Sequence, residues 1–274
     1  MDDHIFGEGY LSIDGAVLKW PRFANERIDM NAPTLGFDER LPLYQRLREE
    51  MLAKIAAGEW TPGAPIPTEA ELTRLYGVAI GTVRKAVDTL VNEGLLLRSQ
   101  GRGTFVRRPN FDASLARFFR QVNASGGREI PASRILARTV QEPSPTVAAA
   151  LELNAGEQVI HLERLRTVEG RTLFHEEIWL PATRFGALLD IDTEDFGELL
   201  YPFYEKQCGQ CIASARETLT VGAADSTMAN ILAIDEGAPV VSIERTALGY
   251  DRSPLEYRLS RAAAEGFRYQ IDIS

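Results

Sequence analysis

The fold is decided by residues 67–106, which read PTEAELTRLYGVAIGTVRKAVDTLVNEGLLLRSQGRGTFV. Thr68 and Glu71 have the spacing of a capping box at the start of a short helix, and Gly77 stops that helix after about two turns. A second helix starts near Ala79 and carries an apolar stripe along one face. Two short helices joined by a tight glycine turn have the geometry of a helix–turn–helix.

A β-hairpin is predicted directly after these helices. Residues 95–98, three leucines followed by Arg98, suit a strand, residues 99–103 form a glycine-rich turn with Arg102 at its tip, and residues 104–106 suit the returning strand. Before the quoted stretch, apolar residues spaced by four predict a further helix from Leu43 to Gly58. Together these segments predict a winged helix–turn–helix over residues 39–108.

The charge of the chain is unevenly distributed. The 274 residues carry a formal net charge of −9, which alone argues against a nucleic-acid partner. Residues 40–108 nevertheless contain 11 Lys and Arg against 7 Asp and Glu, a net of +4, so the remaining residues carry −13. Because phosphate attraction acts over a Debye length, a basic module attached to an acidic body remains compatible with DNA.

Residues 42–106 closely resemble the GntR family of bacterial regulators. The matching residues include Pro42-Leu43-Tyr44, Gly58-Glu59-Trp60-Thr61-Pro62-Gly63, Pro67 to Leu72, Tyr76-Gly77-Val78, Thr82 to Ala86, and Gly101 to Val106. The resemblance implies that double-stranded operator DNA receives the second of the two short helices in its major groove and the hairpin tip in its minor groove. The predicted DNA-binding residues are Thr82, Arg84, Lys85, Arg98, Gly101, Arg102, Gly103 and Thr104. Taken singly, each of these charges is better explained as a solvated surface residue, and only their joint spacing favours contact with DNA.

Three positions depart from the usual GntR pattern. The family usually has an arginine where this chain has Ala70, and Ser-Arg where it has Ala79-Ile80. Ala79 removes the normal N-cap of the recognition helix, which typically costs about 1 kcal/mol. These losses predict an unusual operator, assistance from the N-terminal residues, or a regulator with weakened DNA specificity.

Residues 134–274 contain an internal repeat at an offset of 81. Leu151, Gly156, Val159, Glu163, Arg164 and Arg171 match Leu232, Gly237, Val240, Glu244, Arg245 and Arg252. Each copy predicts a short helix, a glycine turn and two strands joined by a hairpin. Two such copies predict one antiparallel sheet with a pseudo-twofold arrangement and helices packed on it, so the fold class of the chain is α+β.

This second half resembles the UTRA domain, the ligand-sensing domain of HutC-type GntR regulators, whose fold is similar to chorismate lyase. The resemblance implies an effector pocket lined by Arg164, Arg166, Glu176 and Glu256. Arginine suits a carboxylate or phosphate because its planar guanidinium donates two parallel hydrogen bonds. The expected effector is therefore a small polar or anionic metabolite, with His175 as a further candidate. Alternating strand charges are explained equally well by cross-strand ion pairs on a wet face.

The full interpretation is a homodimeric transcriptional regulator, expected to act as a repressor. Its predicted parts are an N-terminal extension (1–38), the winged helix–turn–helix (39–108), a linker helix (109–132) and a UTRA-like domain (133–274). The effector is expected to change the spacing of two winged helices through the linker. No cofactor, metal or membrane partner is predicted, and the absence of a signal-like N-terminus or a bilayer-length apolar run predicts a cytoplasmic protein.

Three rival interpretations remain open. An enzyme is conceivable because the second domain resembles a lyase fold, although no nucleophile with a base and no metal cluster is visible in the sequence. A redox sensor would use Cys208 and Cys211, the only cysteines, although two unpaired thiols near a turn explain them more simply. A degenerate ligand-binding protein with weak DNA specificity would explain the GntR departures.

Overall fold

The computed structural model of the chain describes residues 10–13, 16–19, 40–108, 131–265 and 267. Its contacts divide the chain into two units, residues 1–34 and 35–274. In the first unit, β1 (Tyr10–Ile13) and β2 (Ala16–Lys19) pair as an antiparallel hairpin. The predicted linker helix at residues 109–132 lies almost entirely outside the described residues.

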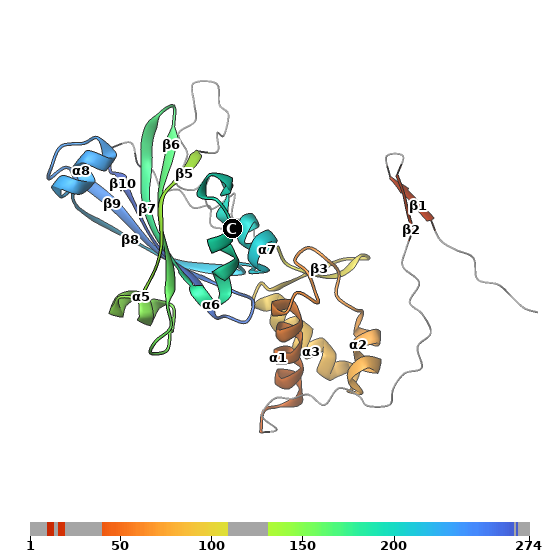
Figure 1. The fold of residues 1–274 in the computed structure, drawn as a ribbon. Helices are drawn as coiled ribbons and strands as arrows, with labels where there is room; N and C mark the ends of the chain where they lie inside the picture. Colours follow the sequence, from red (N-terminus) through yellow and green to blue (C-terminus); the bar gives the residue numbers. More distant parts are fainter. Residues whose placement is uncertain (1–9, 14–15, 20–39, 109–130, 266, 268–274) are drawn as a thin grey trace, which may run out of the picture. The chain divides into compact units, whose positions relative to one another are not determined.

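The winged helix–turn–helix predicted from residues 39–108 is present (Figure 1). Its elements are α1 (Leu43–Ala56), α2 (Glu69–Tyr76), α3 (Ile80–Asn92), β3 (Leu96–Ser99) and β4 (Gly103–Val106), and β3 pairs antiparallel with β4. The apolar stripes of the helices meet in one core, whose fully buried members include Leu47, Met51, Leu72, Val83, Val87 and Leu90.

Both ends of α2 and the start of α3 have the capping features that the sequence predicts. The Thr68 hydroxyl accepts from the Glu71 amide, and the Glu71 carboxylate accepts from the Thr68 amide, which completes the capping box. Gly77 ends α2 in the left-handed region at φ +63°, where a side chain would be strained. Ala79, at the N-cap of α3, makes no side-chain capping bond, as predicted.

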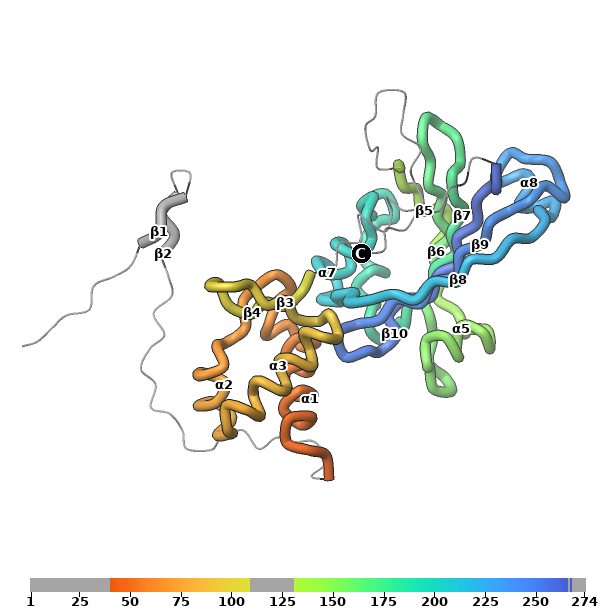
Figure 2. The backbone as a smooth tube through the Cα atoms, turned by 180° about the vertical axis from the view of Figure 1, so that it is seen from behind, coloured from red at the N-terminus to blue at the C-terminus, as the bar shows by residue number. Residues whose placement is uncertain are grey.

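The second half is built on one six-stranded antiparallel sheet. Its strands are β5 (Ala132–Gln141), β6 (Val159–Val168), β7 (Arg171–Pro181), β8 (Ser214–Ala223), β9 (Pro239–Leu248) and β10 (Pro254–Ala263). They lie in the order β5-β6-β7-β10-β9-β8, so β7 and β10, the equivalent strands of the two repeats, pair at the centre. The internal repeat therefore produces the predicted pseudo-twofold sheet, seen from both sides in Figures 1 and 2.

Short helices cover both faces of this sheet. One face carries α6 (Ala182–Phe185), the 3-10 turns η1 (Gly186–Asp190) and η2 (Thr193–Asp195), and α7 (Leu200–Cys208). The other face carries α5 (Pro145–Ala150) and α8 (Ser226–Leu232), the helices that open the two repeats. Ile160, Leu162 and Ile178 pack under α6 and α7, whereas Val159 and Tyr257 pack under α5. Side-chain alternation along each strand thus sorts the residues onto two faces, here called the α7 face and the α5/α8 face.

The described residues contain no helix with both the length and the apolar character needed to cross a membrane. The predicted fold class, a winged helix–turn–helix followed by an antiparallel sheet domain with helices, is confirmed. The two edge strands β5 and β8 were not predicted, because their exposed residues lack a strong alternating pattern.

Candidate functional site

The first candidate site is the exposed side of α3. Val83, Ala86 and Val87 face the core, which leaves Arg84 and Lys85 exposed and Thr82 half-buried at the start of the helix. The Lys85 ammonium lies 3.9 Å from the ring centroid of Tyr44, a cation–π contact that orients the side chain without removing its charge. α3 therefore has a buried core face and an exposed side that carries the predicted DNA-binding residues Arg84 and Lys85.

Glu69 at the start of α2 lies among these basic side chains. Its two carboxylate oxygens accept from the guanidinium groups of Arg84 and Arg98, each at 3.1 Å. Arg98 also pairs with Asp88 at 2.8 Å. The arginines expected to contact DNA are therefore held by carboxylates in the free protein, and both remain about half-exposed, at 58% and 45% of their side-chain surface.

The hairpin tip presents a single arginine. Arg102 is exposed between Gly101 (φ +73°) and Gly103 (φ +113°), two left-handed positions that favour glycine. Its guanidinium lies 5.8 Å from the ring centroid of Phe105, and Thr104 is half-buried at the base of the turn. A narrow glycine-flanked tip bearing one cation suits the narrow minor groove, where the negative potential is enhanced.

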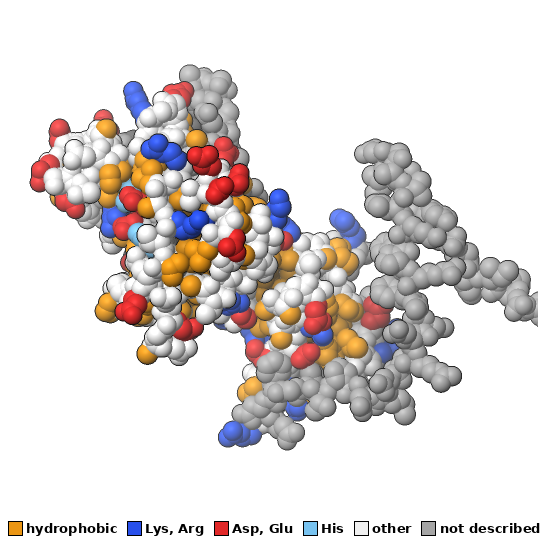
Figure 3. Space-filling view, viewed as in Figure 1, with side chains coloured by type: hydrophobic (Ala, Val, Ile, Leu, Met, Phe, Trp, Pro, Cys, Tyr) orange, Lys and Arg blue, Asp and Glu red, His pale blue; other side chains and the backbone are white. Residues whose placement is uncertain are grey.

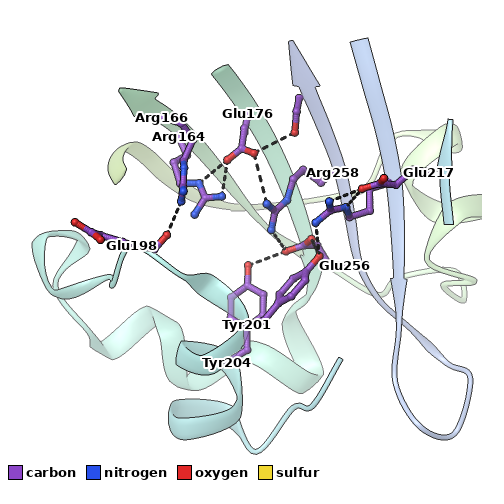
Figure 4. A network of polar contacts seen from close by, with 11 residues as sticks. Arg164, Arg166, Glu176, Glu198, Tyr201, Tyr204, Glu217, Glu256 and Arg258 are labelled. Carbon is purple, nitrogen blue, oxygen red and sulfur yellow. Dashed lines mark hydrogen bonds and ion pairs between the residues drawn. The ribbon is translucent and has the colours of Figure 1, made fainter. Parts of the chain in front are cut away.

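The second candidate site is a network of buried charges on the α7 face of the sheet (Figure 4). It brings together all four residues predicted to line the effector pocket, Arg164, Arg166, Glu176 and Glu256. Each is at most 6% exposed, although charged side chains are rarely buried unless they are paired. The wet-face alternative is therefore wrong for these residues, since the strands on which they lie are covered by α6 and α7.

Glu176 is the hub at one end of the network. It accepts from Arg164 Nε at 2.6 Å, from Ser260 at 3.1 Å and from Arg258 at 3.5 Å. Burial alone would raise the pKa of Glu176, but the neighbouring charges of Arg164 and Arg258 outweigh it and lower the pKa to about 2. Glu176 is therefore ionised at all physiological pH values.

Glu256 is the hub at the other end and is fully enclosed. It accepts from the hydroxyls of Tyr201 and Tyr204 on α7, at 2.9 and 3.0 Å, and from Arg258 at 2.6 Å. Burial, followed by the charge of Glu256, raises the pKa of Tyr204 well above its usual range, so the hydroxyl stays protonated and donates. Glu256 thus ties α7 to the sheet, and its carboxylate is already saturated by protein donors.

Arg245 occupies the position in β9 that the repeat equates with Arg164 in β6. It donates to Glu217 on β8 at 2.6 Å and to the Tyr201 hydroxyl at 3.1 Å. The two repeat-related arginines therefore differ: Arg245 is matched by its own glutamate, whereas Arg164 shares Glu176 with Arg258.

Among the buried side chains of this network, positive charge exceeds negative charge. Arg164, Arg166, Arg245 and Arg258 are buried together with Glu176 and Glu256, while the half-buried Glu217 pairs with Arg245 and the charge of the exposed Glu198 acts on Arg166. Arg166 donates to the backbone carbonyl of the exposed Glu198, and burial, with the nearby charge of Arg164, lowers the pKa of Arg166 to about 10. Nη1 of Arg164 and Nε of Arg258 are buried and have no hydrogen-bond partner among the described residues. Buried donors of this kind are usually satisfied by some group, and an anion is the natural one.

Two family models match this chain in succession. The model for bacterial regulatory proteins of the gntR family matches residues 43–106, and the model for the UTRA domain matches residues 126–268. The HTH-type transcriptional repressor NagR of Bacillus subtilis is 30% identical over 232 residues, covering 84% of this chain and 93% of NagR. The chain belongs to the GntR family.

Further relatives agree with this GntR assignment. The HTH-type transcriptional regulator GgaR of Escherichia coli is 30% identical over 229 residues, covering 83% of this chain and 89% of GgaR. The ligand-binding domain of a GntR-family transcriptional regulator from Bordetella bronchiseptica superposes with a TM-score of 0.50 at 28% identity, covering 54% of this chain and 95% of that domain. The network of buried charges therefore lies in the UTRA domain of a GntR regulator.

Sequence reasoning missed seven members of the network in this GntR chain, namely Glu198, Tyr201, Tyr204, Glu217, Arg245, Arg258 and Ser260. Arg245 could have been predicted from the internal repeat, which aligns it with Arg164. The tyrosines carried no such signal, because they come from α7, which has no counterpart among the described elements of the second repeat.

His175 does not join the network, which corrects its prediction as a pocket candidate. It precedes Glu176 by one position in β7, so its side chain points to the α5/α8 face, where Nε2 lies 2.8 Å from a Glu163 oxygen. His161 lies on that face too and stacks on Trp179 with ring centroids 5.0 Å apart.

The cysteines of this GntR chain show no sign of reactivity. Both are free thiols, and burial raises the pKa of each, to about 11 for Cys211. Because the thiolate is the reactive species, the geometry does not favour the redox alternative. Within the described ranges, no group of three or more His, Cys, Asp or Glu side chains is arranged to hold a metal ion.

Proposed function

We propose that this GntR chain is a transcriptional repressor whose affinity for operator DNA is controlled by a small anionic metabolite bound in its UTRA domain. The observation that carries the proposal is the buried arginine network, with its excess of positive charge, joined in one chain to a winged helix–turn–helix with exposed arginines. The relatives NagR and GgaR, named as a transcriptional repressor and a transcriptional regulator, support the same interpretation.

The DNA-binding half of the proposal rests on α3 and the hairpin tip. Arg84 and Lys85 lie exposed where a recognition helix reads the major groove, and Arg102 lies where a wing enters the minor groove. Arg98 and the backbone of Gly101, Gly103 and Thr104 add phosphate contacts. Acidic side chains also gather away from this surface, at the end of the sheet domain that holds α8, as Figure 3 shows.

The effector half of the proposal rests on charge and unmatched donors. An anion placed between Arg164 and Arg166 would accept a charge-assisted hydrogen bond from Nη1 of Arg164 and offset the repulsion between these two guanidinium groups. Glu176 holds Arg164 from the other side and orients it. Glu256 serves in a different role from the one predicted, since its bonds to Tyr201 and Tyr204 make it a link between the sheet and α7 rather than a ligand contact.

The test is a gel-shift titration of the full chain against the DNA that flanks its own gene, at two salt concentrations and beside shuffled competitor. The proposal expects binding that resists the competitor and weakens as salt rises. Arg84→Ala and Arg102→Ala should each weaken binding about tenfold or more, whereas Arg134→Ala, an exposed arginine of β5, should leave it unchanged. Binding no tighter than to the competitor, across the regions upstream and downstream, would contradict the repressor assignment.

The effector is identified by measuring the melting temperature of the same protein in the presence of sugar phosphates, phosphonates and carboxylates. A compound that raises the melting temperature and releases the DNA identifies the ligand class, because binding to the folded state stabilises it. Stabilisation only by uncharged sugars would contradict the anion-binding role of Arg164 and Arg166.

A further inference from the structure

The start of α3 carries an exposed apolar side chain. Ile80, the first residue of this helix, is 50% exposed, whereas Val83 and Val87 of the same helix are fully buried. Single exposed apolar side chains are common on protein surfaces, so exposure alone says little. Ile80 also lies one turn before Arg84, and residues four apart lie on the same face of a helix. Ile80 therefore belongs to the exposed side of α3 that carries the predicted DNA-binding residues.

The residues on either side of Ile80 have no hydrogen-bonding side chains. Ala79 and Gly81 flank it and are both exposed, and the Ala79 side chain makes no capping hydrogen bond. A Cβ at Gly81 would meet nothing within 4 Å, so the space beside Gly81 is open. The first side chain of α3 that can form a hydrogen bond is that of Thr82. Side chains at residues 79–81 can therefore recognise a base only through apolar contact.

DNA offers one apolar group of this kind in its major groove, the 5-methyl group of thymine. In helix–turn–helix proteins, the N-terminal residues of the recognition helix contact the base edges. α3 begins at Ile80, directly after the turn that follows α2 (Figure 1). A half-exposed isoleucine at this place can pack against a thymine methyl group, and the contact removes apolar surface of both from water.

We propose that Ile80 is a specificity-determining residue that selects thymine in the operator through its 5-methyl group. This role rests on the proposed function, because it requires that α3 enters the major groove. Arg84, which donates to Glu69 in the free protein, supplies attraction to phosphate or guanine one turn further along α3. Ile80 distinguishes thymine from cytosine, since cytosine lacks the methyl group at the same ring position.

The test begins with duplexes that the full natural chain selects from a random pool. The most tightly bound duplex is then synthesised with uracil in place of thymine at one position after another, because uracil lacks only the 5-methyl group. Fluorescence anisotropy measures the affinity for each duplex. Uracil at the thymine that Ile80 contacts should weaken binding about fourfold, which corresponds to one buried methyl group.

Two variants assign this response to Ile80. Ile80→Ala replaces a half-exposed side chain, so it leaves the core intact, and the shortened side chain should no longer respond to uracil at that position. Leu97→Ala is the matched control, since Leu97 is 55% exposed in the same winged helix–turn–helix. It alternates along β3 with Arg98, which pairs with Glu69, so Leu97 faces the other way and its variant should keep the fourfold response.

Ile80→Arg tests the same role by a change of preference. Selection with this variant should yield guanine at the position where the natural chain selects thymine, because arginine donates two hydrogen bonds to O6 and N7 of guanine. Unchanged base preferences in Ile80→Arg, or an equal response to uracil in the natural chain and in Ile80→Ala, would overturn the role of Ile80 and leave the regulator assignment intact. A selection that enriches no sequence over the starting pool would contradict the regulator assignment and the role of Ile80 together.

Discussion

Glu69 pairs with two of the arginines that are predicted to bind DNA, Arg84 and Arg98. Its oxygens hold Arg84 and Arg98 at 3.1 Å, and all three side chains are partly exposed. Exposed ion pairs of this kind contribute little to stability, because solvent and salt screen them. A phosphate that approaches must displace the carboxylate and is repelled by it. The carboxylate therefore acts on DNA affinity far more than on folding.

Glu69→Gln is expected to raise DNA affinity several-fold. It releases two guanidinium groups to bind phosphates, so the dependence of the binding constant on salt should become steeper by about one counterion for each additional phosphate bound. Fluorescence anisotropy at four salt concentrations measures both quantities. Glu59→Gln removes the same charge from an exposed pair with Lys54 elsewhere in the winged helix–turn–helix and should change neither. Weaker binding by the Glu69 variant would show that the carboxylate prepositions the arginines instead.

Glu176 gives the UTRA domain a defined sensitivity to acid. Its folded-state pKa of about 2 lies below the unfolded value of 4.5, so its contribution to stability is present above pH 4.5 and is lost as the pH falls toward 2. The difference corresponds to roughly 3 kcal/mol. Glu176→Gln should lower the midpoint of urea unfolding at pH 7. Between pH 4.5 and 3, the midpoint of the variant should decrease less with falling pH than that of the natural chain. The exposed Glu142→Gln is the control and should retain the natural pH profile.

At the scale of elements, the start of α3 is the weakest part of the DNA-binding unit. The Ala79 side chain makes no capping hydrogen bond. Gly81 in the first turn increases the conformational entropy that the chain loses on folding. No packing contact requires a glycine there, because a Cβ at this position would meet nothing within 4 Å. α2, only a few residues away, has a complete capping box. The recognition helix is therefore less well fixed at its N-terminal end than the helix that supports it.

Ala79→Ser and Gly81→Ala should each stabilise α3 by about 1 kcal/mol. Hydrogen exchange of peptides from α3 measures the effect locally, and exchange through local opening should slow by about fivefold. Thr68→Ala removes the capping hydrogen bond of α2 and should make hydrogen exchange in α2 faster, which checks the sensitivity of the method. Unchanged exchange in both α3 variants would show that packing against α1, and not the helix start, limits opening.

The elements also show which parts of the structure the sequence predicted. The capping box, the glycine stops and the repeat act over short distances, so they located α1, α2 and α3, the short helices α5 and α8, the hairpin and the four central strands. Arg164, Arg166, Glu176 and Glu256 were predicted as one site from the resemblance to the UTRA domain, and the pairing of β6 with β7 and of β7 with β10 brings them together. Tyr201 and Tyr204 were not, since their place depends on how α7 packs across the sheet. His175 was misplaced because adjacent strand residues face opposite ways.

At the scale of the whole molecule, regulation requires that a small ligand in one domain changes the DNA affinity of another. The network offers a physical basis, since Arg258 bridges Glu176 near the proposed anion site and Glu256, to which α7 is bonded. An anion that competes for Arg164 or Arg258 alters the bonds that hold α7 to the sheet. Coupling of this kind depends on the ligand interacting differently with two states of the protein.

Arg166→Gln should separate sensing from DNA binding. Burial and the nearby charge of Arg164 disfavour the charge of Arg166, and glutamine keeps an amide that can donate to the Glu198 carbonyl, so the substitution is expected to leave the fold and the DNA affinity of the ligand-free protein intact. Loss of a charged hydrogen bond to the anion should weaken the compound that releases the natural chain from DNA by roughly 10- to 100-fold. The measurement is a titration of that compound into the preformed DNA complex, with the exposed Arg171→Gln on the same hairpin as control. If Arg166→Gln released DNA at the natural concentration, the anion would bind elsewhere. If instead the Arg166→Gln variant failed to bind DNA at all, the network would be needed to stabilise the DNA-binding conformation as well as to bind the ligand.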